Sequence, residues 1–325
     1  MTPTVASPRP SGDSTPPDAP LWARAWPHIR RWAPAVLGVV VLGLLLSHAH
    51  KVDWAGAWAA LKKYEVMTLV AVFGITTASH ALYGCFDLIG RRHTKHGLSA
   101  VQTWSIAVTS YAFNLNLGAL VGGMAMRARL YARAGLEAAT VAQIVGLSLA
   151  TNWLGYALLG GGLFAAGVIV PPPQAHMAGT TLRVLGAVMV LVAIGYVVAC
   201  AVWHGTEWKV RGKRIHLPSP RIAVLQLVLS SANWALMGTA MWMLLGGKVE
   251  WGMALGTLMA ASIVGVMVPI PAGLGVLEAV YLALLSGVVP QGELMGAVLA
   301  YRALYYLVPL AGGLAMYVAL ERKFK

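Results

Sequence analysis

Charged residues are scarce in this sequence. Asp, Glu, Lys and Arg make up only 11% of the chain, whereas a soluble domain carries about 25%. Acidic residues are the scarcer sign, with 11 Asp and Glu against 24 Lys and Arg. No stretch between the apolar segments is long enough for a soluble domain, since the longest loop covers only residues 203–221. These shortages exclude an enzyme built on a soluble catalytic domain.

Cysteine is also rare, and the familiar catalytic motifs are missing. Cys85 and Cys200 both lie inside apolar segments, so we interpret them as small buried side chains with no disulfide and no metal site. The sequence contains no nucleotide-binding loop, no zinc-protease motif and no serine-hydrolase elbow. His93 and His96 fall in a basic loop and are read as solvated side chains. We therefore expect no cofactor and no metal.

Long apolar runs dominate what is present. Hydrophobic residues form 58% of the chain, and several runs reach the roughly 20 residues that cross a bilayer as a helix. Backbone groups in lipid must bond within their own segment, so the spans are expected to be helical. The sequence predicts an all-α polytopic membrane protein. Its N-terminus, 1–32, begins with a Pro- and Ser-rich stretch and is expected to be disordered and cytoplasmic, and 33–49 is expected to be an uncleaved first span.

The distribution of basic residues predicts the topology. If every apolar segment crossed fully, with the N-terminus inside, most Lys and Arg would lie outside, against the positive-inside rule. Treating 98–138 and 252–290 as re-entrant hairpins from opposite sides returns most of them to the cytoplasm. The prediction is about six full spans plus two re-entrant hairpins, with both termini cytoplasmic. The net charge of +13 then indicates topology and lipid headgroups rather than nucleic acid.

The two halves of the chain are predicted to form an inverted repeat. Residues 33–170 and 183–320 share the order span, span, hairpin, span in opposite orientation, separated by an external loop at 171–182 and followed by a cytoplasmic tail at 321–325. This is a recurring plan of transporters. Identical residues recur at offsets of 151–155. The matches are Ala78, Ala81, Leu82 and Gly84 with Ala232, Ala235, Leu236 and Gly238, Gly118 with Gly273, and Gly161, Gly162 and Leu163 with Gly312, Gly313 and Leu314.

Each hairpin has a stretch that resists a straight helix. Glycine permits a chain reversal that other residues resist, and proline cannot donate a backbone hydrogen bond. The tips are expected near mid-membrane. The predicted tip residues are Gly118, Gly122 and Gly123 in the first hairpin, and Pro269, Pro271, Gly273 and Gly275 in the second.

Ionisable residues at membrane depth are functional candidates by default. Glu278 and Arg302 are each surrounded by apolar sequence, and each is the natural counter-charge of the other. Glu278 is either a functional-site residue or a structural one that pins its hairpin by pairing with a neighbour, and both roles can hold at once. Arg127 lies closest to the glycines of the first hairpin, whereas Arg129 and Arg133 read as an ordinary cytoplasmic edge. Asp87 lies near the cytoplasmic end of its span and is expected to be solvated.

Neutral polar residues complete the candidate site. Asn114 and Asn116 sit in the first hairpin, and Asn152 lies near the repeat equivalent of Arg302. They would supply uncharged hydrogen bonds to a headgroup. Tyr301 and Tyr305, like Tyr306, belong either to an interfacial aromatic belt or to the lining of a cavity.

Three of these stretches resemble a known family. N-x-N-x-G with the following GG-x-x-x-R-x-R-L-Y at 114–131, P-x-P-x-G-L-G-x-x-E at 269–278 and A-Y-R-x-x-Y-Y-x-x-P at 300–309 are similar to the lysylphosphatidylglycerol synthase transmembrane-region family, also called YbhN-like. The resemblance runs over roughly 33–320. In bifunctional members this region looks like the flippase for aminoacylated phosphatidylglycerol, which a separate synthetase domain makes. No synthetase domain accompanies it here, so we expect no aminoacylation by this chain.

The leading hypothesis is a lipid translocase of the bacterial inner membrane. Its partner would be a membrane phospholipid with an anionic or aminoacylated headgroup, not nucleic acid. Arg127 and Arg302 would contact phosphate, and Glu278 would balance or gate. Movement would be passive or ion-coupled. Two other classes stay open: a scaffold or accessory subunit for a separately encoded lipid-modifying enzyme, and a membrane-embedded lipid enzyme, for which no nucleophile or metal cluster stands out.

Overall fold

The computed structural model describes residues 58–59, 61–169, 179–203, 207–210, 213–267 and 273–324. The predicted disordered N-terminus (1–32), the predicted first span (33–49) and most of the predicted external loop lie outside these residues. So do two of the predicted tip residues, Pro269 and Pro271. The helices and the charged site candidates lie inside them.

Five helices are long and apolar enough to cross a membrane. They are α3 (Val66–Thr94), α6 (Ala138–Ala165), α7 (Gly179–Val202), α8 (Pro220–Leu244) and the run Gln291–Lys323. That run consists of α11 (Gln291–Tyr301), a π-helical segment η4 (Arg302–Leu307) and α12 (Val308–Lys323). The described residues therefore form a polytopic helical membrane protein, as the apolar runs predict.

The sequence sets where these helices begin and end. The Ser219 hydroxyl accepts a hydrogen bond from the Ile222 N–H at the start of α8, where Pro220 occupies the first turn. Both features favour helix initiation. The last turn of α3 carries Arg91, Arg92 and His93, which suit the negative end of the helix dipole.

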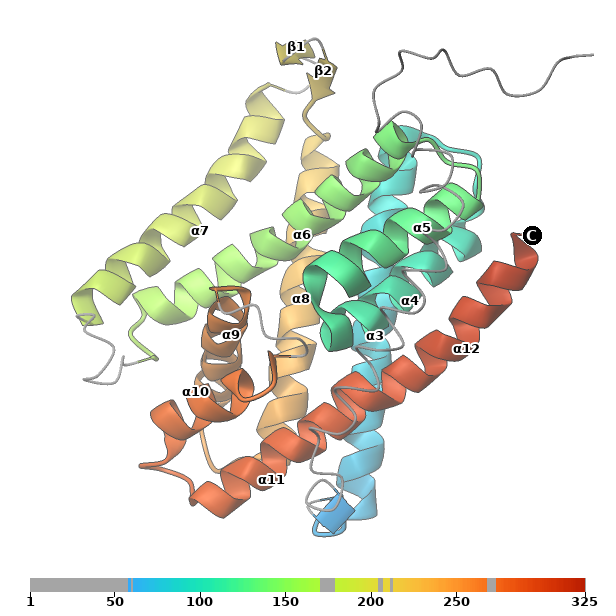
Figure 1. Ribbon diagram of the computed structural model, residues 1–325. Coiled ribbons are helices and arrows are strands. Elements are labelled where there is room, and N and C mark those ends of the chain that lie inside the picture. The colour runs from blue at the N-terminus through green and yellow to red at the C-terminus, as the bar shows by residue number, and fades with distance from the viewer. Residues whose placement is uncertain are drawn as a thin grey trace, which may run out of the picture.

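The segment 100–133 reverses direction instead of crossing as one helix. α4 (Ala100–Gly118) ends at Gly118, whose φ of 82° is left-handed and breaks the helix. The π-helical segment η1 (Ala119–Ala125) and α5 (Met126–Arg133) then pack back against α4, as Figure 1 shows.

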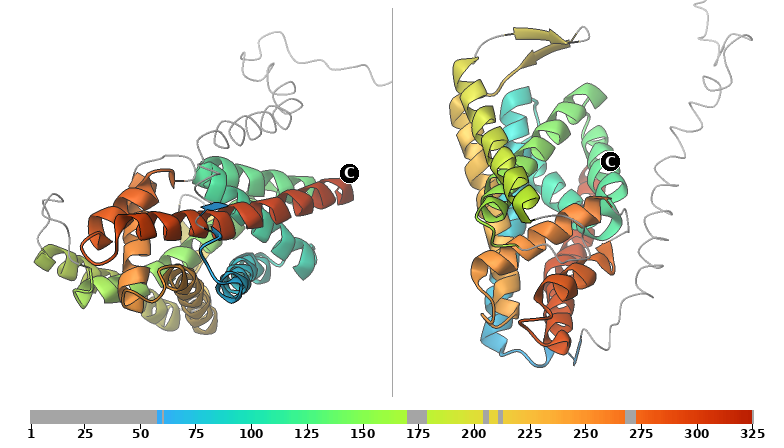
Figure 2. Two further views of the ribbon diagram at one scale, coloured as in Figure 1. Left: turned by 90° about the horizontal axis from the view of Figure 1, so that it is seen from below. Right: turned by 90° about the vertical axis from the view of Figure 1, so that its left-hand side faces the viewer.

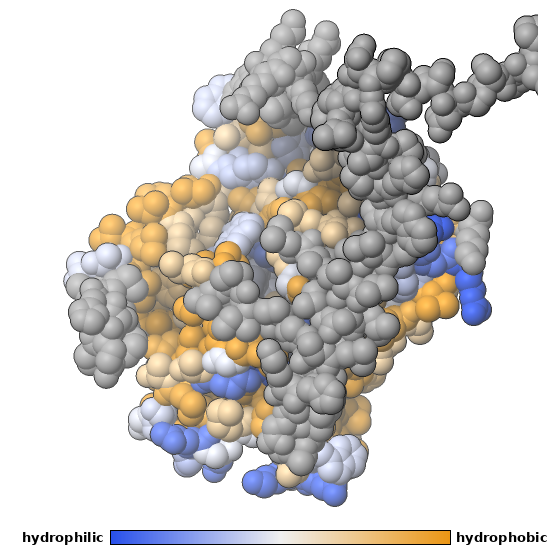
Figure 3. Space-filling view, in the orientation of Figure 1, coloured by the Kyte–Doolittle hydropathy of each residue, from blue (hydrophilic) through white to orange (hydrophobic). Residues whose placement is uncertain are grey.

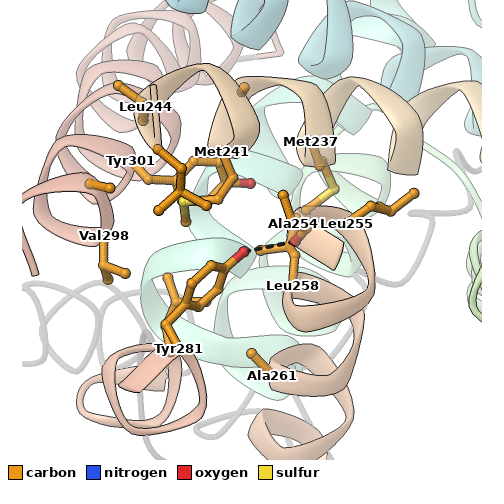
Figure 4. Close-up of a cluster of buried hydrophobic side chains, with 14 of the residues drawn as sticks. Met237, Met241, Leu244, Ala254, Leu255, Leu258, Ala261, Tyr281, Val298 and Tyr301 are labelled. Atoms are coloured by element: carbon orange, nitrogen blue, oxygen red, sulfur yellow. Dashed lines mark hydrogen bonds between the residues drawn. The ribbon is translucent and has the colours of Figure 1, made fainter. Parts of the chain in front are cut away.

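A second pair of short helices follows α8. α9 (Trp251–Met267) and α10 (Val276–Leu285) pack together, and the Tyr281 hydroxyl donates to the carbonyl of Ala254 at 3.0 Å. Figure 4 shows this bond inside the largest apolar cluster, which fills the space between α8, α9, α10 and α11. Glycines 273 and 275 both have positive φ, 55° and 82°, just before α10 begins.

A two-stranded ribbon departs from the expected all-helical plan. β1 (Glu207–Val210) and β2 (Lys213–His216) pair antiparallel, with Trp208 opposite Ile215. Figures 1 and 2 place the ribbon at one end of the bundle, beyond the ends of α7 and α8. Residues 61–65 lie at the opposite end, which agrees with opposite sides for the loops that the charge distribution predicts.

The outer flank of the bundle is apolar. α7 exposes a row of large aliphatic side chains: Val184, Leu185, Val188, Leu191, Val192, Ile194 and Val198. Figure 3 shows apolar residues over the flank where α7 lies, with hydrophilic residues gathered at the lower end. An apolar surface this large would not stay exposed to water, so we assign this flank to lipid.

Candidate functional site

Glu278 and Arg302, the two charged residues that are flanked by apolar sequence in the second half, form an ion pair. Arg302 Nε donates to Glu278 Oε1 at 2.6 Å, and Arg302 Nη2 donates to Glu278 Oε2 at 2.9 Å. The two parallel bonds make a bidentate pair, which is the strong geometry for arginine and carboxylate. Only 7% of the Arg302 side chain and 16% of the Glu278 side chain are exposed. The pairing expected from the sequence is therefore present.

This pair also holds the turn before α10. Glu278 Oε2 accepts from the backbone N–H of Gly275 at 3.0 Å, and Arg302 Nη2 donates to the carbonyl of Gly273 at 2.7 Å. Glu278 thus caps the N-terminus of α10, where a carboxylate is also favoured by the helix dipole. The geometry therefore supports the structural role predicted for Glu278, which is to hold its hairpin, and is compatible with ligand binding by the same pair.

A second buried charge cluster lies between α3, α5 and α6. Arg127 Nη1 is 3.5 Å from Asp87 Oδ1 and donates to the Ser148 hydroxyl at 3.2 Å, while the Tyr131 hydroxyl donates to Asp87 Oδ2 at 2.8 Å. Asp87 has no exposed side-chain surface, so the expectation that it is solvated is wrong. The signal that could have found it is its spacing: Thr76, His80, Tyr83 and Asp87 follow one face of α3.

The second cluster is less completely bonded than the first. Asp87 Oδ1 and Arg127 Nε are buried without a hydrogen-bond partner among the described residues. Buried polar atoms are usually satisfied, so unsatisfied ones call for an explanation such as a ligand. Arg127 therefore keeps a free donor in this arrangement.

A row of tyrosines connects the two clusters. The Arg127 guanidinium lies 5.7 Å from the ring centre of Tyr83, and Tyr83 stacks on Tyr111 at 3.7 Å. The hydroxyls of Tyr111 and Tyr305 are 3.2 Å apart, and Tyr305 stacks on Tyr301 at 5.0 Å. The last step is Tyr306, whose ring lies near Tyr305 and 5.7 Å from the Arg302 guanidinium. We call these five tyrosines the tyrosine row.

The burial of the tyrosine row bears on whether Tyr301 and Tyr305 form an interfacial belt. Tyr301 and Tyr305 are fully buried, so they are interior residues and not an interfacial belt. Figure 4 shows the Tyr301 ring among the apolar side chains beneath α8. Sequence reasoning missed Tyr83 and Tyr111, because nothing in the chain order indicates which tyrosines of separate helices will meet.

A polar layer crosses the middle of the tyrosine row. The Ser79 hydroxyl donates to Asn233 Oδ1 at 2.8 Å and lies 2.6 Å from the Tyr305 hydroxyl. The His80 ring is 4.9 Å from both Tyr111 and Tyr305. These side chains come from α3, α4, α8 and η4, so four separate segments meet here.

The three predicted asparagines occupy different environments. Asn116 Nδ2 donates to the carbonyls of Ala112 and Tyr306, at 2.9 and 3.1 Å. The first bond lies within α4, and the second joins α4 to η4. The side chain of Asn114 lies against Gly123. The Asn152 carbonyl accepts from Ser230 and Trp234 of α8, which ties α6 to α8 through main chain.

The three glycines of the first hairpin have two different roles, chain reversal and close packing. Gly118 makes the reversal, as its φ shows. Gly122 and Gly123 lie in η1, where an added Cβ would collide with the Phe113 carbonyl and come within 2.8 Å of Asn114 Oδ1. These two permit close packing of the returning segment, not the turn itself.

Both arginines adjoin a π-helical segment. η1 ends two residues before Arg127, and η4 begins at Arg302. Pro309 follows η4 and lacks the N–H that an α-helix would use there. Such π segments occur frequently at functional sites.

The basic residues at the end of α5 pair with one carboxylate of α12. Arg129 donates to Glu321 Oε1 at 2.9 Å, and Arg133 lies 3.5 Å from Glu321 Oε2. They fasten α5 to the end of α12. Within the described ranges, no group of three or more His, Cys, Asp or Glu is placed to hold a metal ion.

Comparison with known proteins agrees with this architecture. The model of the family described as lysylphosphatidylglycerol synthase TM region matches residues 32–313. The chain is 42% identical to Inner membrane protein YbhN of Escherichia coli (strain K12) over 246 residues, covering 76% of this chain and 77% of that protein. It is 25% identical to an uncharacterized protein of Synechocystis, covering 80% and 83%. This chain is a polytopic membrane protein of the lysylphosphatidylglycerol synthase TM region family.

Proposed function

We propose that this protein moves a phospholipid between the leaflets of a bacterial inner membrane, by passing the headgroup along the tyrosine row. One observation carries the proposal. Two buried arginines, Arg127 and Arg302, lie at the ends of a continuous row of aromatic and hydroxyl groups. Arginine binds phosphate through its planar fork and stacks on aromatic rings, so each end could receive a lipid phosphate.

The carboxylates would act as stand-ins for the phosphate. Glu278 occupies the fork of Arg302 and Asp87 approaches Arg127. A headgroup phosphate entering either site would compete for the same guanidinium, and the displaced carboxylate could pair with a cationic headgroup. This arrangement suits an anionic or aminoacylated phospholipid. The acyl chains would remain in lipid beside the apolar flank.

The inverted repeat supports two equivalent half-sites. Ser79 and Asn233 are 154 positions apart, the offset that relates α3 to α8, and their side chains bond to each other at 2.8 Å. Two symmetry-related residues can touch only beside the axis that relates them. That contact supports a pseudo-two-fold axis between α3 and α8, as an inverted repeat would have.

The packing of the short helices repeats as well. A Cβ added to Gly84 would come within 2.5 Å of the Trp104 side chain on α4, and one added to Gly238 within 2.7 Å of Leu255 on α9. Gly84 and Gly238 are related by the offset of 154, and Trp104 and Leu255 by 151. Equivalent glycines therefore admit equivalent helices, which supports reading both α4–α5 and α9–α10 as re-entrant hairpins entering from opposite faces.

Transport of lipid in proteoliposomes tests the proposal. The purified protein is reconstituted with fluorescent phosphatidylglycerol, and leaflet exchange is followed by quenching from outside. Arg302→Lys keeps the charge but loses the fork, and the lost charge-assisted bond of about 1.5–3 kcal/mol should slow exchange roughly 10- to 100-fold. Arg133→Lys, on the half-exposed edge of α5, is the matched control.

Two outcomes would redirect the proposal. Wild-type exchange rates in both Arg302→Lys and Glu278→Gln would show that this pair is not in the transport path. Absence of exchange for every lipid, together with crosslinking to a lipid-modifying enzyme, would favour the scaffold function. The Escherichia coli relative is an inner membrane protein, which supports the membrane proposed here.

A further inference from the structure

His80 is a buried imidazole with one unused nitrogen. It lies on α3 near mid-length, is 5% exposed, and is held between the rings of Tyr111 and Tyr305. Its Nδ1 is 2.9 Å from the carbonyl oxygen of Thr76, while its Nε2 is buried with no hydrogen-bond partner among the described residues.

The bonded nitrogen fixes the tautomer. A carbonyl oxygen can only accept, so Nδ1 must carry the hydrogen in the bond to Thr76. In the neutral ring, Nε2 is then an unprotonated lone pair inside the protein. A buried acceptor left without a donor is costly, so Nε2 is the one ring atom at which an incoming donor or proton would be bound.

The groups facing His80 are aromatic or neutral. Tyr111 comes from α4 and Tyr305 from η4, while α8 contributes Asn233 and Met237 to the same layer. On α3 itself, Asp87 lies two turns away and is already engaged by Arg127 and Tyr131. Neither carboxylate, Asp87 or Glu278, bonds to the imidazole, because Nδ1 is used by Thr76 and Nε2 has no hydrogen-bond partner among the described residues.

We propose that His80 is a proton-binding site through which movement of an anionic headgroup is coupled to uptake of a proton. This inference rests on the proposed function. When an anionic headgroup reaches the polar layer, a proton from water binds Nε2, and the new N–H donates to a phosphate oxygen. The proton returns to water when the headgroup leaves.

Physical linkage makes the two events mutually dependent. An imidazolium without an acceptor is disfavoured in a buried site, and a phosphate without a donor is disfavoured there as well. The flanking rings of Tyr111 and Tyr305 would assist, because aromatic faces attract cations. By reciprocity, the anion raises the affinity for the proton by the same factor as the proton raises the affinity for the anion.

Proton uptake on lipid binding tests this directly. Purified protein in weakly buffered detergent is mixed with dihexanoylphosphatidylglycerol, and a pH-indicator dye reports protons taken up while thermal stabilisation reports binding. Wild type should take up about one proton per bound headgroup near neutral pH. Dihexanoylphosphatidylcholine, which is zwitterionic, should cause less uptake.

Variants assign the uptake to His80. His80→Gln places a neutral amide near Nε2, and His80→Asn places one near Nδ1, so at least one should fold; both should abolish the uptake and flatten the pH dependence of exchange in proteoliposomes. Ser79→Ala is the matched control. It removes hydrogen bonds from the same layer without removing a titratable group, and its pH profile should keep the wild-type midpoint.

The outcomes separate this inference from the proposed function. Lipid exchange by the wild type with no proton uptake, or uptake that persists in both His80 variants, overturns the role of His80 and leaves the translocase standing. Absence of exchange by the wild type at every pH overturns both. Loss of uptake in the His80 variants with exchange retained at one rate across pH supports His80 as the coupling site.

Discussion

The Arg302–Glu278 pair allows a thermodynamic cycle with a defined magnitude. We would compare Glu278→Gln, Arg302→Met and the double variant with wild type. The amide introduced by Glu278→Gln keeps an oxygen for the Gly275 N–H, so the cap on α10 survives and the change is mainly one of charge. Each single variant leaves one buried charge uncompensated, which costs about 3–5 kcal/mol, or roughly 10²- to several thousand-fold in the folding equilibrium.

The double variant should be more stable than the sum of the single effects predicts. With both charges gone, no buried charge lacks a partner, and replacing a buried pair by neutral residues is often tolerated. We expect a coupling energy of at least about 2 kcal/mol. The assay is thermal unfolding in detergent, followed by the fluorescence of the 12 tryptophans.

An exposed ion pair provides the internal reference. Lys248 and Glu293 form a salt bridge with about half of each side chain exposed, so Glu293→Gln should cost only about 0–1 kcal/mol. The single variants at the buried pair should lower the melting temperature on the order of 10 °C. Equal shifts for Glu278→Gln and Glu293→Gln, or strict additivity in the double variant, would refute the reasoning.

Three further predictions concern the other half and the topology. Asp87→Asn should lower the free energy of unfolding by about 3–5 kcal/mol, because it leaves the buried Arg127 charge without a counter-charge. This loss should be larger than that caused by Tyr131→Phe in the same unfolding assay, and the reverse order would contradict a charge-based role. Gly122→Ala should cost about 1–3 kcal/mol, since its Cβ meets the Phe113 carbonyl, whereas Gly74→Ala, with open space around it, should be neutral or stabilising by up to about 1 kcal/mol. A cysteine introduced within 203–221 should not react with a membrane-impermeant thiol reagent added outside intact cells, because this loop is predicted to be cytoplasmic. Labelling there would contradict the predicted topology.

The sequence predicted those features that depend on one segment at a time. The lengths of the apolar runs indicate the spanning helices, and Glu278 and Arg302 stand out because nothing else near them in sequence is charged. Features that need two helices were harder. Asp87 looked solvated because it lies near a basic loop, and its burial depends on Arg127 and Tyr131 arriving from another segment. The tyrosine row has no signature in chain order, although the polar spacing along α3 hints at one half of it.

The π-helical segment η4 has a mechanical consequence. A π segment holds one residue more per turn than the α-helix that it interrupts. The helix from Gln291 to Lys323 therefore contains one residue more than a continuous α-helix of the same length would. Passing that residue to the neighbouring turn would rotate the intervening side chains by about 100° and shift them about 1.5 Å. Arg302 would swing away from Glu278 without any hinge or domain movement. Distances between helices would barely change, whereas the accessibility of a cysteine placed at 305 would change greatly.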